Sequence, residues 1–114
     1  MKTSELDGPA LNWAVQEALL KTLPQPALGI LIHRVGYGHK VAAYSTDWAQ
    51  GGPIIEQERI CVEFDHHENG EAWSAAYDNE TGPWRFGTTP LIAAMRCFCC
   101  AKLGDEIEIP KELI

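Results

Sequence analysis

The sequence lacks the features that most readily assign a protein to a functional class. The chain has 114 residues, and its apolar runs are all much shorter than the ~20 residues that a membrane span needs. Residues 1–5 contain no apolar signal segment. The patterns GxSxG, GxxxxGK[ST], HExxH and GxGxxG do not occur either. We therefore expect a cytoplasmic protein, outside the membrane, that is more likely a binding protein than an enzyme.

Positive charge is scarce, with nine Lys and Arg against 16 Asp and Glu, and a net charge of −7. Proteins that bind nucleic acid usually carry a basic stripe, because their affinity comes from neutralising phosphates and releasing counterions. The sequence therefore argues against direct binding of nucleic acid. The acidic residues are spread along the chain, which is typical of a solvated surface; DNA mimicry and attraction to a basic partner are the alternatives.

Cysteine occurs at only four positions: Cys61, Cys97, Cys99 and Cys100. Cys97 and Cys100 have CxxC spacing, but they fall within a strongly helical pattern rather than in a turn. A structural zinc site would also need two further ligands close by. We interpret the cysteines as reduced, small hydrophobic residues of a buried helix, and we expect neither a metal nor a cofactor.

Apolar spacing predicts two helices. The first covers residues 8–22, begins after Asp7 and ends before the prolines at 24 and 26. The second covers residues 90–103, with Thr89 as its N-cap, proline in the first turn and glycine just beyond its end. Its residues are mostly apolar, so we expect it to be the central helix of the domain.

Strand signals occur at four places. Residues 29–35 are rich in β-branched side chains and predict a buried strand. Residues 60–65 and 72–77 predict an antiparallel hairpin around Asn69-Gly70, and residues 105–109 alternate as a last strand. Residues 78–87 are predicted to form a loop. The whole chain, residues 1–114, is therefore predicted to be a single α+β domain of about four mostly antiparallel strands packed on two helices.

The most distinctive segment is residues 44–56, which combines small polar side chains, a tryptophan and a Gly-Gly-Pro bend. These residue types are typical of a site for a small polar ligand. Tyr44 or Trp48 would stack on a planar ligand, while Asp47, Gln50 and backbone amides would bind its polar edge. The structural alternative is that Ser45 or Thr46 caps a short helical turn and that Trp48 buries its ring.

Arg96 is the charged residue in the first turns of the central helix. A buried arginine needs a partner, so we expect either an ion pair with Asp47 or Glu56, or an anion-binding role suited to phosphate. Residues 84–86 are Trp, Arg and Phe, and these residue types are common at protein interfaces. We therefore expect a homodimer. The predicted ligand-binding residues are Tyr44, Ser45, Thr46, Asp47, Trp48, Gln50, Gly51, Gly52, Trp84, Arg85 and Arg96.

Several separated blocks of the sequence resemble the NinX-like family of bacteriophage proteins. They are residues 3–6 with 11–15, residues 44–56, residues 89–97 and residues 102–110. The resemblance implies an accessory protein of a phage or prophage that acts inside the bacterial host. The family is a domain of uncharacterised function, so the resemblance brings no active site that could be assigned to these residues.

Together these observations predict a non-enzymatic accessory protein that binds a small phosphate-bearing ligand, similar to a nucleotide. By analogy with phage accessory proteins in general, counter-defence is one role that such binding would serve. The alternatives are a protein–protein interaction module that inhibits a host protein, and a small enzyme that acts on a nucleotide.

Overall fold

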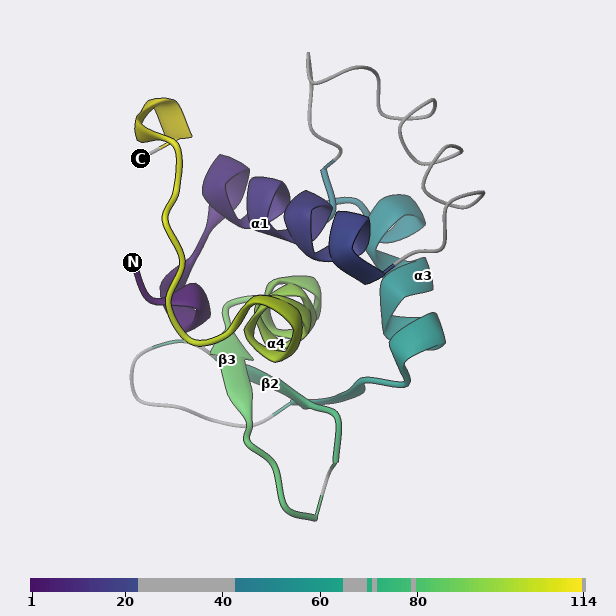
Figure 1. Ribbon diagram of the computed structural model, residues 1–114. Coiled ribbons are helices and arrows are strands. Elements are labelled where there is room, and N and C mark those ends of the chain that lie inside the picture. Colours follow the sequence, from purple (N-terminus) through teal and green to yellow (C-terminus); the bar gives the residue numbers. More distant parts are fainter. Residues whose placement is uncertain (23–42, 65–69, 71, 79, 114) are drawn as a thin grey trace.

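The computed structural model describes residues 1–22, 43–64, 70, 72–78 and 80–113 (Figure 1). The predicted strand at residues 29–35 lies outside these ranges. The described residues form three α-helices and one three-stranded antiparallel sheet, so the α+β class is confirmed and the predicted count of four strands on two helices needs correction. The elements are η1 (Thr3–Glu5), α1 (Gly8–Thr22), α3 (Trp48–Glu58), β1 (Cys61–Phe64), β2 (Trp73–Ala76), β3 (Arg85–Gly87), α4 (Pro90–Leu103) and η2 (Lys111–Leu113).

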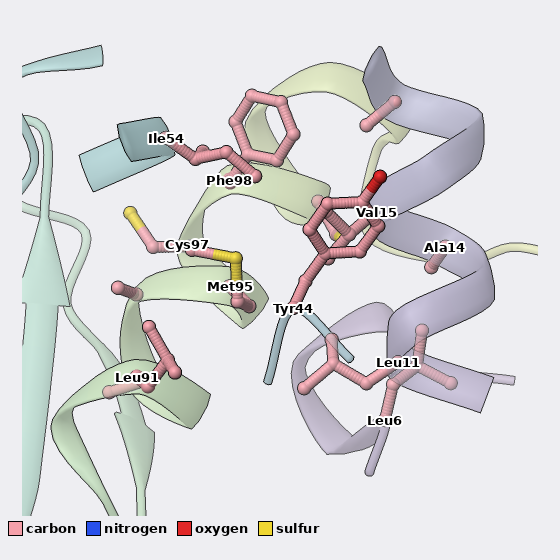
Figure 2. Close-up of a cluster of buried hydrophobic side chains, with 14 of the residues drawn as sticks. Leu6, Leu11, Ala14, Val15, Tyr44, Ile54, Leu91, Met95, Cys97 and Phe98 are labelled. Carbon is pink, nitrogen blue, oxygen red and sulfur yellow. The ribbon is translucent and has the colours of Figure 1, made fainter. Parts of the chain in front are cut away.

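Helix α4 is the centre of the fold, as the sequence predicts. The Thr89 side chain accepts a hydrogen bond from the Ile92 N–H at 3.1 Å, and Gly104 ends the helix with a φ of 90°. Helix α4 lies between α1 and the sheet (Figure 1). Its residues from Ala93 to Cys100 are all buried, and Figure 2 shows Met95 and Phe98 in the cluster that α4 forms with α1.

The sheet has the order β1-β2-β3, with both pairs of strands antiparallel. The predicted hairpin is confirmed, because Cys61 pairs with Ala76 and Phe64 pairs with Trp73. The prediction of a loop over residues 78–87 is wrong at its end, where β3 pairs with β2. A strand of three residues is too short to show alternation in the sequence. Residues 85–87 form a strand because they pair with the edge of β2 that β1 leaves free.

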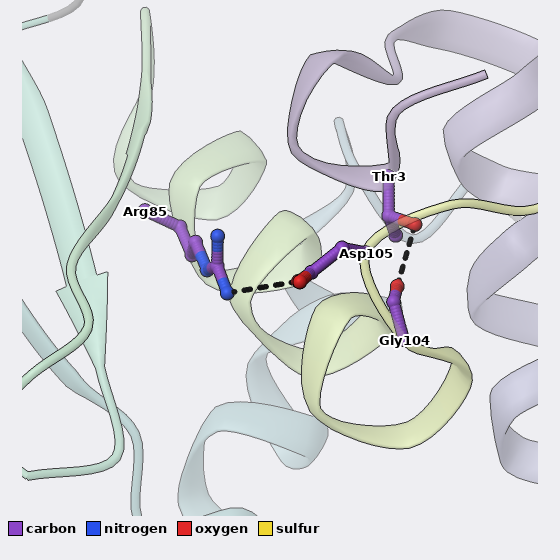
Figure 3. A network of polar contacts seen from close by, with 4 residues as sticks. All are labelled: Thr3, Arg85, Gly104 and Asp105. Atoms are coloured by element: carbon purple, nitrogen blue, oxygen red, sulfur yellow. Dashed lines mark hydrogen bonds and ion pairs between the residues drawn. The ribbon is translucent and has the colours of Figure 1, made fainter.

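The two ends of the described chain lie against each other, and the strand predicted at residues 105–109 is not formed. Instead, an isolated bridge joins Lys2 to Glu106. The Thr3 N–H donates to the Asp105 carbonyl at 2.9 Å, and the Thr3 hydroxyl donates to the Gly104 carbonyl at 2.7 Å (Figure 3). The alternating residues do pair with another segment, but that segment turns into η1 after only two residues and leaves no room for a longer ladder.

Helix α3 replaces the bend that the sequence predicts at Gly51-Gly52-Pro53, because these three residues lie inside the helix. Its N-cap is Asp47, whose side chain accepts a hydrogen bond from the Ala49 N–H at 2.9 Å, rather than Ser45 or Thr46. Glycine and proline both disfavour a helix interior. Burial of apolar side chains on the inner face of α3, such as Ile54, offsets that cost. Within the described ranges, every helix is too short or too polar to cross a membrane.

Candidate functional site

The first residues of the predicted ligand segment are held by α1. Tyr44 is buried, and its hydroxyl donates a hydrogen bond to the Gln16 side-chain oxygen at 2.7 Å. The backbone N–H and the hydroxyl of Ser45 both donate to the Asn12 side-chain oxygen, at 2.9 and 2.8 Å. Asn12 and Gln16 are not among the site residues predicted from the sequence. Their spacing of four residues on a helix was the available signal, because it places both side chains on one face.

The side chains of Asp47 and Gln50 form hydrogen bonds at the first turn of α3. One carboxylate oxygen of Asp47 accepts from the Ala49 N–H, and the other accepts from the Gln50 side-chain amide at 2.7 Å. The Gln50 side-chain oxygen in turn accepts a hydrogen bond from the Ala43 N–H at 2.9 Å. The groups predicted to bind the polar edge of a ligand are thus engaged within the segment itself.

Trp48 differs from these neighbours because 55% of its surface is exposed. The alternative of a buried Trp48 ring is therefore wrong. A Cβ added to Gly52, one turn further along α3, would lie 3.7 Å from the Trp48 ring atom Cε3. Gly51 is instead buried between the Tyr44 carbonyl and the Leu91 side chain, and Thr46 is exposed. Trp48 is thus the large aromatic side chain that this segment presents to solvent.

Arg96 is buried on the side of α4 that faces the N-terminal segment and β3. Its Nε donates a hydrogen bond to the Leu6 carbonyl at 2.7 Å, and its Nη1 donates to the Phe86 carbonyl at 2.8 Å. Only 7% of its surface is exposed. The guanidinium therefore joins the N-terminal segment to β3 through two main-chain carbonyls, which are not among the partners predicted from the sequence. Its predicted roles, in an ion pair with Asp47 or Glu56 or in binding an anion, stay predictions.

Arg85 and Trp84 lie at the edge strand β3. The Arg85 guanidinium forms an ion pair with Asp105 at 3.4 Å (Figure 3), and Trp84 is half-buried just before the strand. The predicted ligand residues therefore fall into two groups with different neighbours. Residues 44–52 contact α1 and the start of α4, whereas Arg85 and Arg96 contact the ends of the chain and β3.

A further polar cluster has no signal in the sequence, because its members come from three separate elements or loops. The Tyr77 hydroxyl donates to Glu58 at 2.8 Å, and the Lys102 ammonium lies 3.1 Å from the same carboxylate oxygen. Burial, together with this hydrogen bond and the nearby negative charge, raises the pKa of Tyr77 above its usual range. The cluster joins the end of α3 to the last turn of α4, so its evident role is structural.

The four thiols are free. Burial raises the pKa of Cys97 to about 11, and it also raises the pKa of Cys99 and of Cys100. Among the described residues, no group of three or more His, Cys, Asp or Glu side chains is arranged to hold a metal ion. The thiols of Cys97, Cys99 and Cys100 therefore have the environment of buried hydrophobic residues rather than of reactive nucleophiles.

We expect Cys61 to be the fastest-reacting thiol of the native protein, because it is only half-buried and the other three are buried. At mildly alkaline pH, a chromogenic disulfide reagent should modify about one thiol quickly, and all four after denaturation. Rapid reaction of a second thiol in the native protein would contradict this.

Elemental analysis that finds about one zinc ion per chain, lost in Cys97→Ser, would overturn the metal-free interpretation.

Comparison with known protein families assigns the chain. Residues 2–102 match the family model for bacteriophage P22 NinX. The chain belongs to the NinX family. No curated protein matches it. Membership in this phage family indicates a phage accessory protein. The matched residues include all of α3 and all three strands of the sheet. Residues 104–107, which form hydrogen bonds to the N-terminal segment, lie beyond the match.

Proposed function

We propose that this NinX-family protein is a non-enzymatic phage accessory protein that acts by binding a protein of the bacterial host through the exposed first turn of α3. The observation that carries the proposal is the exposure of Trp48 beside polar side chains that are already hydrogen-bonded. An exposed tryptophan held on a helix is a typical anchor at protein interfaces, where tryptophan is enriched among the residues that contribute most to binding.

The internal hydrogen bonds also bear on the other candidate ligands. Tyr44, Ser45, Asp47 and Gln50 already form hydrogen bonds within the fold, so a small polar ligand would have to share or displace these contacts. The Asp47 carboxylate also lies at the N-terminus of α3, where it opposes the approach of a phosphate. These features favour a protein partner over a nucleotide-like ligand. The phosphate-bearing ligand, the counter-defence role and the homodimer stay predictions.

Affinity capture tests the proposal. The immobilised protein should retain a defined host protein from a lysate of the bacterium that the phage infects, and Trp48→Ala should lose it. Phe64→Ala is the matched control, because it removes an aromatic side chain that is 62% exposed on β1 rather than on α3. Equal recovery by wild-type protein and by Trp48→Ala would contradict the proposal.

A thermal-shift screen with nucleotides and cyclic nucleotides distinguishes the small-ligand prediction. A ligand present at about 100 times its dissociation constant adds about 2.7 kcal/mol to the stability of the folded state, which gives a clear shift. We expect no shift with any of these compounds. A reproducible shift that is lost in Trp48→Ala would instead favour the nucleotide-like ligand.

A further inference from the structure

We infer that the partner docks through a basic segment, with an arginine side chain stacked on Trp48 and a second cation at Glu56. This inference rests on the proposed function and adds the chemistry of the partner. It concerns one line of residues on α3, here called the α3 stripe: Trp48, Gly52 and Glu56.

The α3 stripe follows from helix geometry. Residues four apart lie nearly above one another on a helix, so Trp48, Gly52 and Glu56 form one row. The row is exposed at its two ends, at Trp48 and Glu56, and the half-buried Gly52 between them lies beside the Trp48 ring. With a rise of 1.5 Å per residue, Trp48 and Glu56 are about 12 Å apart along the axis. The stripe thus offers an indole face and, two turns further along the helix, a carboxylate.

The charge of the surface favours a cationic partner. The chain has a net charge of −7, and three of its basic side chains already have partners within the fold. Arg85 pairs with Asp105, Lys102 pairs with Glu58, and Arg96 donates to main-chain carbonyls. The two ion pairs each use one acidic and one basic side chain, so the excess of acidic residues in the chain is unchanged. That negative net charge attracts a basic segment and accelerates its association.

Arginine fits the stripe better than lysine. A guanidinium stacks flat on an indole ring and also binds a carboxylate through two parallel hydrogen bonds, whereas an ammonium is a compact, strongly hydrated charge. An extended peptide advances by about 3.3 Å per residue, so it covers the distance between Trp48 and Glu56 in about four residues. The expected binding segment is therefore extended, with two basic residues separated by about that spacing.

The test is a titration of isotope-labelled protein with a short synthetic peptide that carries two arginines four residues apart, followed by NMR. The amide signals of residues 47–57 should shift and saturate. Trp48→Ala should weaken binding about tenfold, and a lysine peptide should bind several-fold more weakly than the arginine peptide. Trp48→Phe keeps an aromatic face and should fall between wild type and Trp48→Ala.

Charge-matched variants separate this site from general attraction. Glu56→Gln should weaken binding about threefold, whereas Glu108→Gln removes the same charge from an exposed position outside α3 and should change binding little. The inference is overturned if both variants weaken binding equally, if Trp48→Ala binds as wild type does, or if the shifts lie outside residues 47–57. Trp48-dependent capture of a host protein without any response to the arginine peptide overturns the basic partner and leaves the proposed function standing.

Discussion

Gly51→Ala is expected to destabilise the protein by about 3 kcal/mol, whereas its neighbour Gly52→Ala is expected to stabilise it by up to about 1 kcal/mol. A Cβ on Gly51 would collide with the backbone carbonyl of Tyr44 and would lie 2.7 Å from the Leu91 side-chain atom Cδ1. The carbonyl belongs to a buried turn and has little freedom to move. A Cβ on Gly52 would make only an ordinary contact at 3.7 Å with the Trp48 ring, so the better helix propensity of alanine remains.

Urea unfolding of the two variants beside wild-type protein measures both effects. The opposite signs are the informative result, because both variants make the same chemical change in adjacent positions of α3. Equal destabilisation by both variants would contradict the helix and would instead support the bend that the sequence predicts at residues 51–53. A neutral Gly51→Ala would place α3 farther from α4 than the structure has it.

Arg96→Met is expected to lower the free energy of unfolding by about 3 kcal/mol, because it leaves the buried Leu6 carbonyl and the partly buried Phe86 carbonyl without these donors. Methionine keeps much of the apolar stem, so the loss reports mainly on the hydrogen bonds and the charge. Arg85→Met is the matched control. Its ion pair with Asp105 is 3.4 Å long and Asp105 is exposed, so the expected loss is under about 1 kcal/mol.

Denaturant unfolding of both variants, with the slope compared to detect changes in the exposed surface, measures these losses. If Arg96→Met proves nearly as stable as wild type while Arg85→Met does not, the buried guanidinium is not the main link between the N-terminal segment and β3. Its role would then have to be sought in binding an anion, which the sequence analysis also considered.

The elements that were predicted correctly carry their signals within a few neighbouring residues. Helix α4 has its N-cap, its proline and its terminal glycine at the expected positions, and α1 shows regular apolar spacing. The β1–β2 hairpin likewise follows from the alternation of residues 60–65 and the Asn69-Gly70 turn signal that precedes residues 72–77. Local capping and periodicity are properties of a short window, so the sequence is enough to reveal them.

The elements that were predicted incorrectly depend on contacts between distant residues. The Gly-Gly-Pro stretch is helical because α3 packs against α4, which overrides the local preference of those residues. Strand β3 exists because β2 has a free edge, and residues 105–107 bond to the first three residues instead of forming a strand of their own. Such pairings are invisible in a window of the sequence.

The candidate site divides in the same way. Residue types and their order are enough to show that residues 44–56 are unusual, that Arg96 belongs to a mostly apolar helix and that the chain resembles the NinX family. Which of these side chains face solvent depends on how distant segments pack together. Trp48 is exposed, whereas Asp47 and Gln50 bond to near neighbours in the sequence. Tyr44 bonds to Gln16, a residue of α1 that only the packing of two distant segments brings beside it.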